Sequence, residues 1–173
     1  MKQRLAADLV RPDPDRAIAM LADLQQETRE ALENLRELAR GIYPPLLADL
    51  GLVAALESRA RKSPVPVAID ADGAGRYTQQ VEAAVYFCCL EALQNVAKYA
   101  GASTVHIHLA GEGGWLTFTV ADDGHGYDSS TTAIGSGIQN MADRLSALGG
   151  SLNVRSMPGA GTTVAGRIPV AAE

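Results

Sequence analysis

The chain has 173 residues, 47% of them hydrophobic and 20% charged, which is enough apolar material for one ordinary domain, alone or with an appendage. Its formal net charge of -5 argues against a nucleic-acid-binding protein and against an anionic membrane surface as a partner. No stretch is long and apolar enough to cross a bilayer, so we expect a cytoplasmic chain, which leaves a membrane-bound parent protein open.

A long charged helix is predicted near the start, because residues 16–40 contain neither glycine nor proline. Small or apolar residues recur in it at spacings of three and four for about three heptads, at Leu21, Leu24, Thr28, Ala31, Leu35, Leu38 and Ile42. So narrow a seam favours packing on another helix over packing on its own domain. Gly41 then ends the helix and Tyr43-Pro44-Pro45 makes an extended link, so we expect two parts, residues 1–43 and 44–173.

The following segments mix helical and strand patterns. We predict a helix at Leu46–Arg61, a short strand at Val65–Ile69, a polar turn at Asp70–Gly75 and a helix of about six turns at Gln79–Ala100. The last helix carries adjacent cysteines, Cys88 and Cys89, which point in different directions and make a poor disulfide. We therefore expect them to be buried as small hydrophobic residues.

Three polar residues share one face of the predicted helix Gln79–Ala100. Asn95 follows Glu91 by four positions and Lys98 follows Asn95 by three. A carboxylate, an amide and an ammonium in a row suit a metal–phosphate site, because Mg²⁺ prefers hard oxygen ligands and lysine can balance phosphate charge. The alternative is an ordinary exposed face of a charged helix.

A predicted hairpin, Thr104–Ala110 and Trp115–Ala121, leads into Asp122-Asp123-Gly124-His125-Gly126. A carboxylate at a strand end can accept a hydrogen bond from the exocyclic amine of a purine, and glycines beside it let the backbone approach a flat ligand. The alternative is a simple tight turn. His106 and His108 alternate on the first strand, where a polar sheet face is a better interpretation than a metal site without a third ligand.

The remaining segments predict a lid and a second phosphate-facing element. Asp128–Ile134 is polar and has the character of a mobile lid over a ligand. Gly135-Ser136-Gly137 opens a helix, Gln139–Leu148, whose first amides can face an anion, although flexible loop punctuation is the alternative for these glycines. Two strands follow, Ser151–Arg155 and Thr162–Ile168, and the Thr162 hydroxyl could reach an adenine ring through water.

Taken together, the motifs resemble the GHKL ATPase superfamily, which includes histidine kinases, gyrase-type ATPases, Hsp90 and mismatch-repair ATPases. They are Glu91-x-x-x-Asn95-x-x-Lys98, Asp122-x-Gly124-x-Gly126, Gly135-x-Gly137 and Gly159-x-Gly161-Thr162. The run from Leu38 to Leu47, followed by Leu50-Gly51-Leu52, is similar to bacterial sensor histidine kinases of the nitrate-sensor and lipid-thermosensor type. The resemblance implies a two-layer α/β (α+β) sandwich, a mixed sheet with helices on one face, preceded by a long dimerisation-type helix.

The resemblance also implies roles for the matching positions. The implied nucleotide-binding residues are Asn95, Lys98, Asp122, Gly124, Gly126, Gly135, Gly137 and Thr162. Asp122 would read adenine, Asn95 would bind Mg²⁺ and Lys98 would contact phosphate. Glu91 matches the residue that activates water in hydrolytic members, so it is a candidate catalytic residue. Tyr99 and Tyr43 stand where the family commonly has histidine.

The implied activity is transfer of the γ-phosphoryl group of ATP to a histidine on a dimerisation helix, and from there to a response regulator. The family's acceptor histidine has no counterpart in residues 1–11, so we expect a chain that starts after the acceptor. Two alternatives are an ATP-dependent regulatory module like the anti-sigma factors and an ATP hydrolase that uses Glu91. Labelled ATP separates the three, through phosphate on a protein, no turnover, or free phosphate.

Overall fold

The computed structural model describes residues 44–128 and 135–170, together with Pro14, Arg16, Ile18 and Leu21. The chain divides into two units, Met1–Tyr43 and Pro44–Glu173. Most of the predicted heptad seam lies outside the described residues, so the long dimerisation-type helix stays a prediction. Within the described part, no helix has the length and apolar character that a membrane span requires.

The second unit contains a mixed sheet of five strands in the order β1-β2-β3-β5-β4. The strands are β1 (Val67–Asp72), β2 (Val105–Glu112), β3 (Trp115–Asp122), β4 (Ser151–Ser156) and β5 (Thr162–Pro169). β1 runs parallel to β2, and the other neighbours are antiparallel. The predicted mixed sheet is confirmed.

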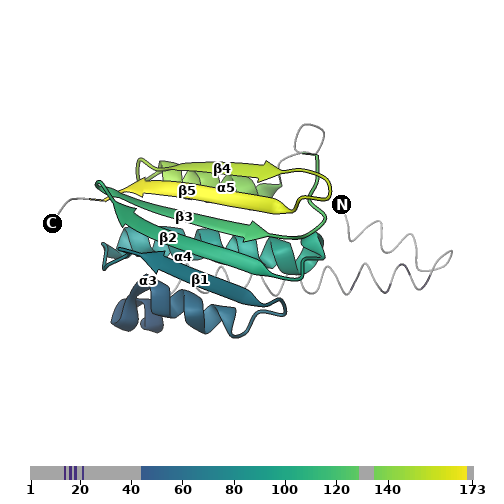
Figure 1. Ribbon diagram of the computed structural model, residues 1–173, viewed down its shortest axis with the longest axis horizontal. Coiled ribbons are helices and arrows are strands. Elements are labelled where there is room, and N and C mark those ends of the chain that lie inside the picture. The colour runs from purple at the N-terminus through teal and green to yellow at the C-terminus, as the bar shows by residue number, and fades with distance from the viewer. Residues whose placement is uncertain are drawn as a thin grey trace. The chain divides into compact units, whose positions relative to one another are not determined.

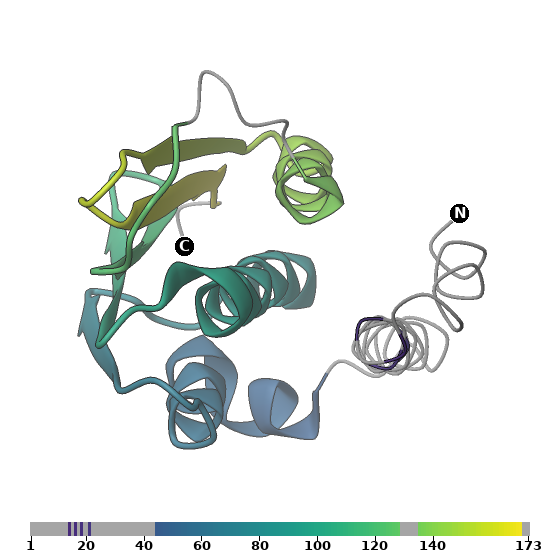
Figure 2. The same ribbon diagram turned by 90° about the vertical axis from the view of Figure 1, so that its right-hand side faces the viewer.

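Three helices cover one face of this sheet (Figures 1 and 2). They are α3 (Pro45–Ala60), α4 (Gln79–Asn95), which continues into a wider π-helical turn, η1 (Val96–Ala100), and α5 (Ser136–Ser146). The predicted two-layer arrangement with helices on one face is therefore confirmed for this unit.

Alternation along the strands separates a buried face from an outer face. In β3, Leu116, Phe118 and Val120 are buried beneath the helices, and Thr117 and Thr119 between them are half-buried on the outer face. The ring of Phe118 lies directly over Gly166 in β5, where any side chain would overlap it. His106 and His108 lie on the outer face of β2, as the polar-face interpretation predicts.

In the first part of this unit, the predicted bounds of one strand are wrong and one predicted helix contains an unexpected break. The strand expected at Val65–Ile69 lies at Val67–Asp72, because its register is set by parallel pairing with β2, from Val67 opposite Val105 to Asp72 opposite Ala110. Asp70–Asp72, expected to begin the polar turn, therefore complete an edge strand, and the turn follows them. The predicted helix Leu46–Arg61 is interrupted at Gly51, whose φ of 82° no helical residue adopts.

A buried carboxylate ties the interrupted helix α3 to the start of α4. Glu82 is fully buried and accepts hydrogen bonds from Arg76 Nε at 2.9 Å and from the Tyr77 amide at 3.1 Å. Arg76 also donates to the carbonyl oxygen of Ala48 at 3.0 Å, and its Cδ fills the space beside Gly51. The break in α3 thus makes room for the guanidinium group.

Both cysteines are buried and free, which confirms their predicted role as small hydrophobic residues. Burial raises the pKa of the Cys88 thiol to about 12, and it also raises the pKa of Cys89. Because the thiolate is the nucleophile, we expect neither thiol to react with an aromatic disulfide reagent at about pH 8 in the folded protein. Both should react after denaturation. If the native chain released the aromatic thiolate from the reagent as fast as free cysteine does, that result would contradict this burial.

Candidate nucleotide-binding site

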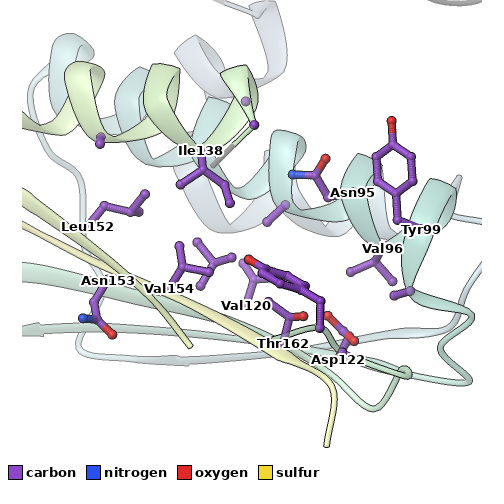
Figure 3. A pocket seen from close by; sticks show the side chains of 18 of the residues that line it. Asn95, Val96, Tyr99, Val120, Asp122, Ile138, Leu152, Asn153, Val154 and Thr162 are labelled. Carbon is purple, nitrogen blue, oxygen red and sulfur yellow. The ribbon is translucent and has the colours of Figure 1, made fainter. Parts of the chain in front are cut away.

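A pocket of about 840 Å³ opens between the sheet and the ends of two helices (Figure 3). Its apolar lining includes Val120, Val154 and Val164, which come from three neighbouring strands, and Leu152. The end of α4 and the start of α5 complete the lining. This volume falls within the range of small-molecule and cofactor sites, and the apolar part of the lining suits contact with a flat ring.

Asp122 and Thr162 provide polar groups side by side at one end of the pocket. They are direct partners across the β3–β5 ladder, and both line the pocket (Figure 3). Oδ1 of Asp122 accepts a hydrogen bond from the Gly124 amide at 2.9 Å. Because an ionised carboxylate has two acceptor oxygens, Asp122 has further acceptor capacity for a ligand.

The neighbouring Asp123 does not line the pocket and instead stabilises the turn that precedes β2. Its carboxylate accepts hydrogen bonds from the Ser103 hydroxyl, from the Ser103 amide at 2.7 Å and from the Thr104 amide at 2.9 Å. These bonds hold the pKa of Asp123 below its usual range, the Ser103 hydroxyl contributing most. Of the two adjacent carboxylates, therefore, Asp122 lines the pocket and Asp123 holds the turn that precedes β2.

The loop after β3 is held between two other parts of the backbone. The His125 amide donates to the Ala100 carbonyl at 2.9 Å, and the His125 carbonyl accepts from the Gly159 amide at 2.7 Å. Gly124 packs against the carbonyl of Ala100, and Gly126 packs against the carbonyl of Met157, so a side chain at either glycine would overlap backbone atoms. These glycines therefore allow close packing between backbone segments, and their predicted approach to a flat ligand stays a prediction.

The face predicted to carry Glu91, Asn95 and Lys98 is divided by the π-helical turn. Asn95 lines the pocket, but Lys98 is exposed and is not among the lining residues. Tyr99 lines the pocket instead, at its exposed edge (Figure 3). The prediction assumed α-helical spacing up to Ala100, and this assumption is wrong because the wider turn η1 changes the direction of the residues that follow Asn95.

The start of α5 lies across the pocket from the strands. Gly135 and Gly137 both line the pocket. The carboxylate of Glu91 lies against Gly137, whose missing side chain leaves room for it, although Glu91 itself is not among the lining residues. Of the predicted lid, Ser129–Ile134 lies outside the described residues.

Ser156 does not line the pocket but contacts two residues that do, and the sequence did not single it out. It is only 6% exposed, at the end of β4, and its Oγ accepts a hydrogen bond from the Tyr127 amide at 2.9 Å. The same Oγ donates to the Gly161 carbonyl at 3.1 Å and lies 2.9 Å from Oγ1 of Thr162. Its register opposite Thr162 is the only signal that marks it, and that register needs the folded sheet.

Among the described residues, no group of three or more histidine, cysteine, aspartate or glutamate side chains could hold a metal ion by itself. On the α4 side of the pocket, the oxygen atoms of the Asn95 amide and of the nearby Glu91 carboxylate fit an ion that takes most of its ligands from a phosphate chain and water. Mg²⁺ is such an ion.

A family model described as the histidine kinase-, DNA gyrase B-, and HSP90-like ATPase matches residues 80–172, which include every motif placed above. The chain belongs to this ATPase family. The match confirms the resemblance to the GHKL superfamily that the four motifs indicated.

Two curated relatives of this ATPase-family chain are histidine kinases. The signal transduction histidine-protein kinase/phosphatase DegS of Brevibacillus brevis is 32% identical over 165 residues, which are 92% of this chain and 43% of that protein. The sensor histidine kinase MctS of Rhizobium johnstonii is 32% identical over 180 residues, which are 97% of this chain and 38% of that protein. The chain thus spans less than half the length of either relative, and neither relative favours an anti-sigma-like module or a simple hydrolase.

Solved structures support the fold. The blue-light activated histidine kinase EL346 of Erythrobacter litoralis matches 69% of this chain with a TM-score of 0.58 at 21% identity, over 41% of that chain. The mycobacterial sensor histidine kinase MprB matches 70% of this chain and 93% of that chain, with a TM-score of 0.52 at 17% identity. Likenesses at this level of identity show a shared fold of the ATPase unit.

Proposed function

We propose that this chain binds ATP with Mg²⁺ and forms the catalytic part of a sensor histidine kinase. In this proposal the γ-phosphoryl group passes to a histidine on a dimerisation helix and then to a response regulator. The observation that carries the proposal is the position of Asp122, an acceptor carboxylate at the end of a pocket with an apolar strand lining and a helix start opposite.

One end of the pocket suits adenine. The valine side chains of β3, β4 and β5 offer a flat apolar surface, and Asp122 offers a charged acceptor to an exocyclic amine. A hydrogen bond to a charged acceptor is stronger than one between neutral groups, so this contact would fix the orientation of the ring. Gly124 and Gly126 shape the loop behind Asp122 by packing against other backbone segments.

The other end suits a phosphate chain. The start of α5 at Gly135–Gly137 presents backbone amides and the positive end of a helix dipole, both of which favour an anion. Asn95 would hold Mg²⁺ through its amide oxygen, and the bound ion would neutralise charge on the phosphates. Lys98, exposed on η1, would add a positive charge, and Glu91 is the candidate base because its carboxylate lies against Gly137.

Catalysis in this arrangement would consist mostly of positioning and charge neutralisation. The three histidines of the chain are poorly placed as acceptors. His106 and His108 lie on the outer face of the sheet, and His125 belongs to the loop beside Asp122. We therefore propose that the acceptor histidine lies outside this chain. We also propose a cytoplasmic location for the chain, and we propose that residues 16–42 form the segment that pairs with other helices.

The test uses ATP labelled on its γ-phosphate and two proteins. One is this chain, and the other is a longer form of the same protein that carries the segment upstream of residue 1, disabled in its own site by Asp122→Asn. We expect acid-labile, alkali-stable label on a histidine of the longer chain when both are present, and none on this chain alone.

Each other outcome contradicts a specific part of the proposal. Label on this chain alone would make one of its three histidines the acceptor. Free phosphate at a steady rate with no labelled protein would support a hydrolase, and no turnover with bound ATP would support a regulatory module. The matched control replaces this chain with its own Asp122→Asn variant, which should slow transfer by about 10- to 150-fold at ATP concentrations below saturation.

A further inference from the structure

Ser156 makes three hydrogen-bonding contacts that between them use every capacity of its hydroxyl group. The side chain is only 6% exposed, and its Oγ contacts the Tyr127 amide, the Gly161 carbonyl and the Thr162 hydroxyl. A serine hydroxyl has one proton to donate and two lone pairs that accept. Its contacts can therefore be assigned by counting protons.

The count fixes the direction of each bond. The Tyr127 amide can only donate, so it takes one lone pair of Ser156. The Gly161 carbonyl can only accept, so it takes the single proton of Ser156. The remaining lone pair faces Oγ1 of Thr162 at 2.9 Å, which means that Thr162 must be the donor in that bond.

Thr162 is therefore left without a proton for the pocket. Its hydroxyl hydrogen is committed to Ser156, and only its lone pairs remain for a ligand. Asp122, its partner across the β3–β5 ladder, is a carboxylate and also only accepts. This end of the pocket thus presents acceptors from both side chains.

We propose that Ser156 is a positioning residue that sets the base selectivity of the site by holding Thr162 as an acceptor. This inference rests on the proposed nucleotide function and adds to it the chemical class that is rejected. A purine with an amine at the 6-position offers donors to the two acceptors, directly or through a water molecule. A purine with a carbonyl there meets lone pairs with lone pairs, and its oxygen lacks a donor.

The test compares the affinities of ATP and inosine triphosphate, which differ in the 6-position group and in the proton on the neighbouring ring nitrogen. Each is titrated with Mg²⁺ into the wild-type chain and into Ser156→Ala by calorimetry. We expect the wild-type chain to prefer ATP. In Ser156→Ala the Thr162 proton is released and can bond to the 6-carbonyl group, so the preference should fall by about fivefold, the worth of one neutral hydrogen bond.

The ratio of the two affinities separates positioning from mere support. Loss of the bonds to Tyr127 and Gly161 would weaken both nucleotides alike and leave the ratio unchanged, and that result would overturn the proposal. A second background isolates Thr162: in Thr162→Val, which has no hydroxyl, adding Ser156→Ala should leave the ratio where it was. A fall in the ratio in that background as well would also overturn the proposal.

A replacement variant covers the case in which Ser156→Ala does not fold, and the affinity of the wild-type chain distinguishes failure of this proposal from failure of the proposed function. If Ser156→Ala does not fold, as judged by circular dichroism, Ser156→Cys keeps the packing but offers the Thr162 hydroxyl a much weaker acceptor, and it takes the place of Ser156→Ala with the same expected change in ratio. A wild-type chain that binds neither nucleotide would contradict the proposed function itself, whereas tight ATP binding with an unchanged ratio in the variants would contradict only the role of Ser156.

Discussion

Replacing Asp122 with asparagine is expected to weaken ATP binding by about 1.5–3 kcal/mol, or about 10- to 150-fold, the range for losing a hydrogen bond to a charged group. The substitution keeps the size of the side chain and one acceptor oxygen, which can still receive the Gly124 amide. The lost interaction is the charged acceptor toward the purine amine. Calorimetric titration of ATP with Mg²⁺ into the two proteins measures the difference.

The adjacent Asp123 provides a matched control. Asp123→Asn makes the same chemical change one residue further on, but this carboxylate bonds Ser103 and Thr104 instead of lining the pocket. Folding lowers the pKa of Asp123, so its ionised form stabilises the fold above its ordinary pKa, and this contribution is lost as the pH falls through the folded value. The variant should therefore lose thermal stability near neutral pH and keep its ATP affinity. Equal loss of affinity in both variants would remove Asp122 from the binding site.

Replacing Gly161 with alanine is expected to displace the backbone of Asp122 and so to weaken ATP binding. Gly161 has a φ of 72°, and a methyl group there would overlap the carbonyl oxygen of Asp122 and approach its Oδ1 to 3.3 Å. The left-handed backbone alone costs about 1–2 kcal/mol for a residue with a side chain. Because the overlapped atom belongs to the backbone of β3, Asp122 must move, so ATP affinity should fall by more than about tenfold.

Replacing Gly159 with alanine is the control that separates the effect of backbone strain from the effect of this overlap. Its φ of 77° is nearly the same, but a methyl group there would meet nothing within 4 Å. Gly159→Ala should thus lower the free energy of unfolding by about 1 kcal/mol and leave ATP affinity unchanged. Denaturant unfolding and calorimetry on both variants give the comparison. A Gly161→Ala chain that binds ATP like the wild type would show that Asp122 is not held by this contact.

The central hairpin and its polar end could be predicted from the sequence, because alternation from Leu116 to Val120 is a strong local signal. Two glycines after Gly111-Glu112 mark the turn, and Asp122 follows the last buried position. Each of these signals lies within one short segment. The same is true of the two cysteines in α4, whose burial follows from helical periodicity.

Other features depended on partners far away in the chain. The boundaries of β1 are set by pairing with β2, so the prolines on either side of Val65 do not mark the ends of the strand. The π-helical turn that directs Tyr99 instead of Lys98 into the pocket lining has no local sequence signal comparable to a glycine or proline. The burial of Glu82 beside Arg76 depends on α3 and α4 lying side by side, which the sequence around Glu82 does not show.

Ser156 illustrates the same limit within the site. In the sequence it is one polar residue at the end of a strand, like several others. Its role follows from the register that places it opposite Thr162 and from the return of the Tyr127 backbone to the same point. A hydrogen-bonding centre assembled from three segments can be recognised only once those segments are adjacent.

The most direct test of the account is to map where a nucleotide binds on this chain. Amide resonances are followed by NMR during titration with a non-hydrolysable ATP analogue and Mg²⁺. We expect the largest changes at the end of α4 around Asn95, in the loop from Asp122 to Tyr127, at the start of α5 and at Thr162. Amides around Trp115 and Arg167, at the far end of the β3–β5 ladder, should remain unchanged. Saturable changes that cluster there instead, or no changes at millimolar nucleotide, would contradict the assignment of the pocket as an ATP site.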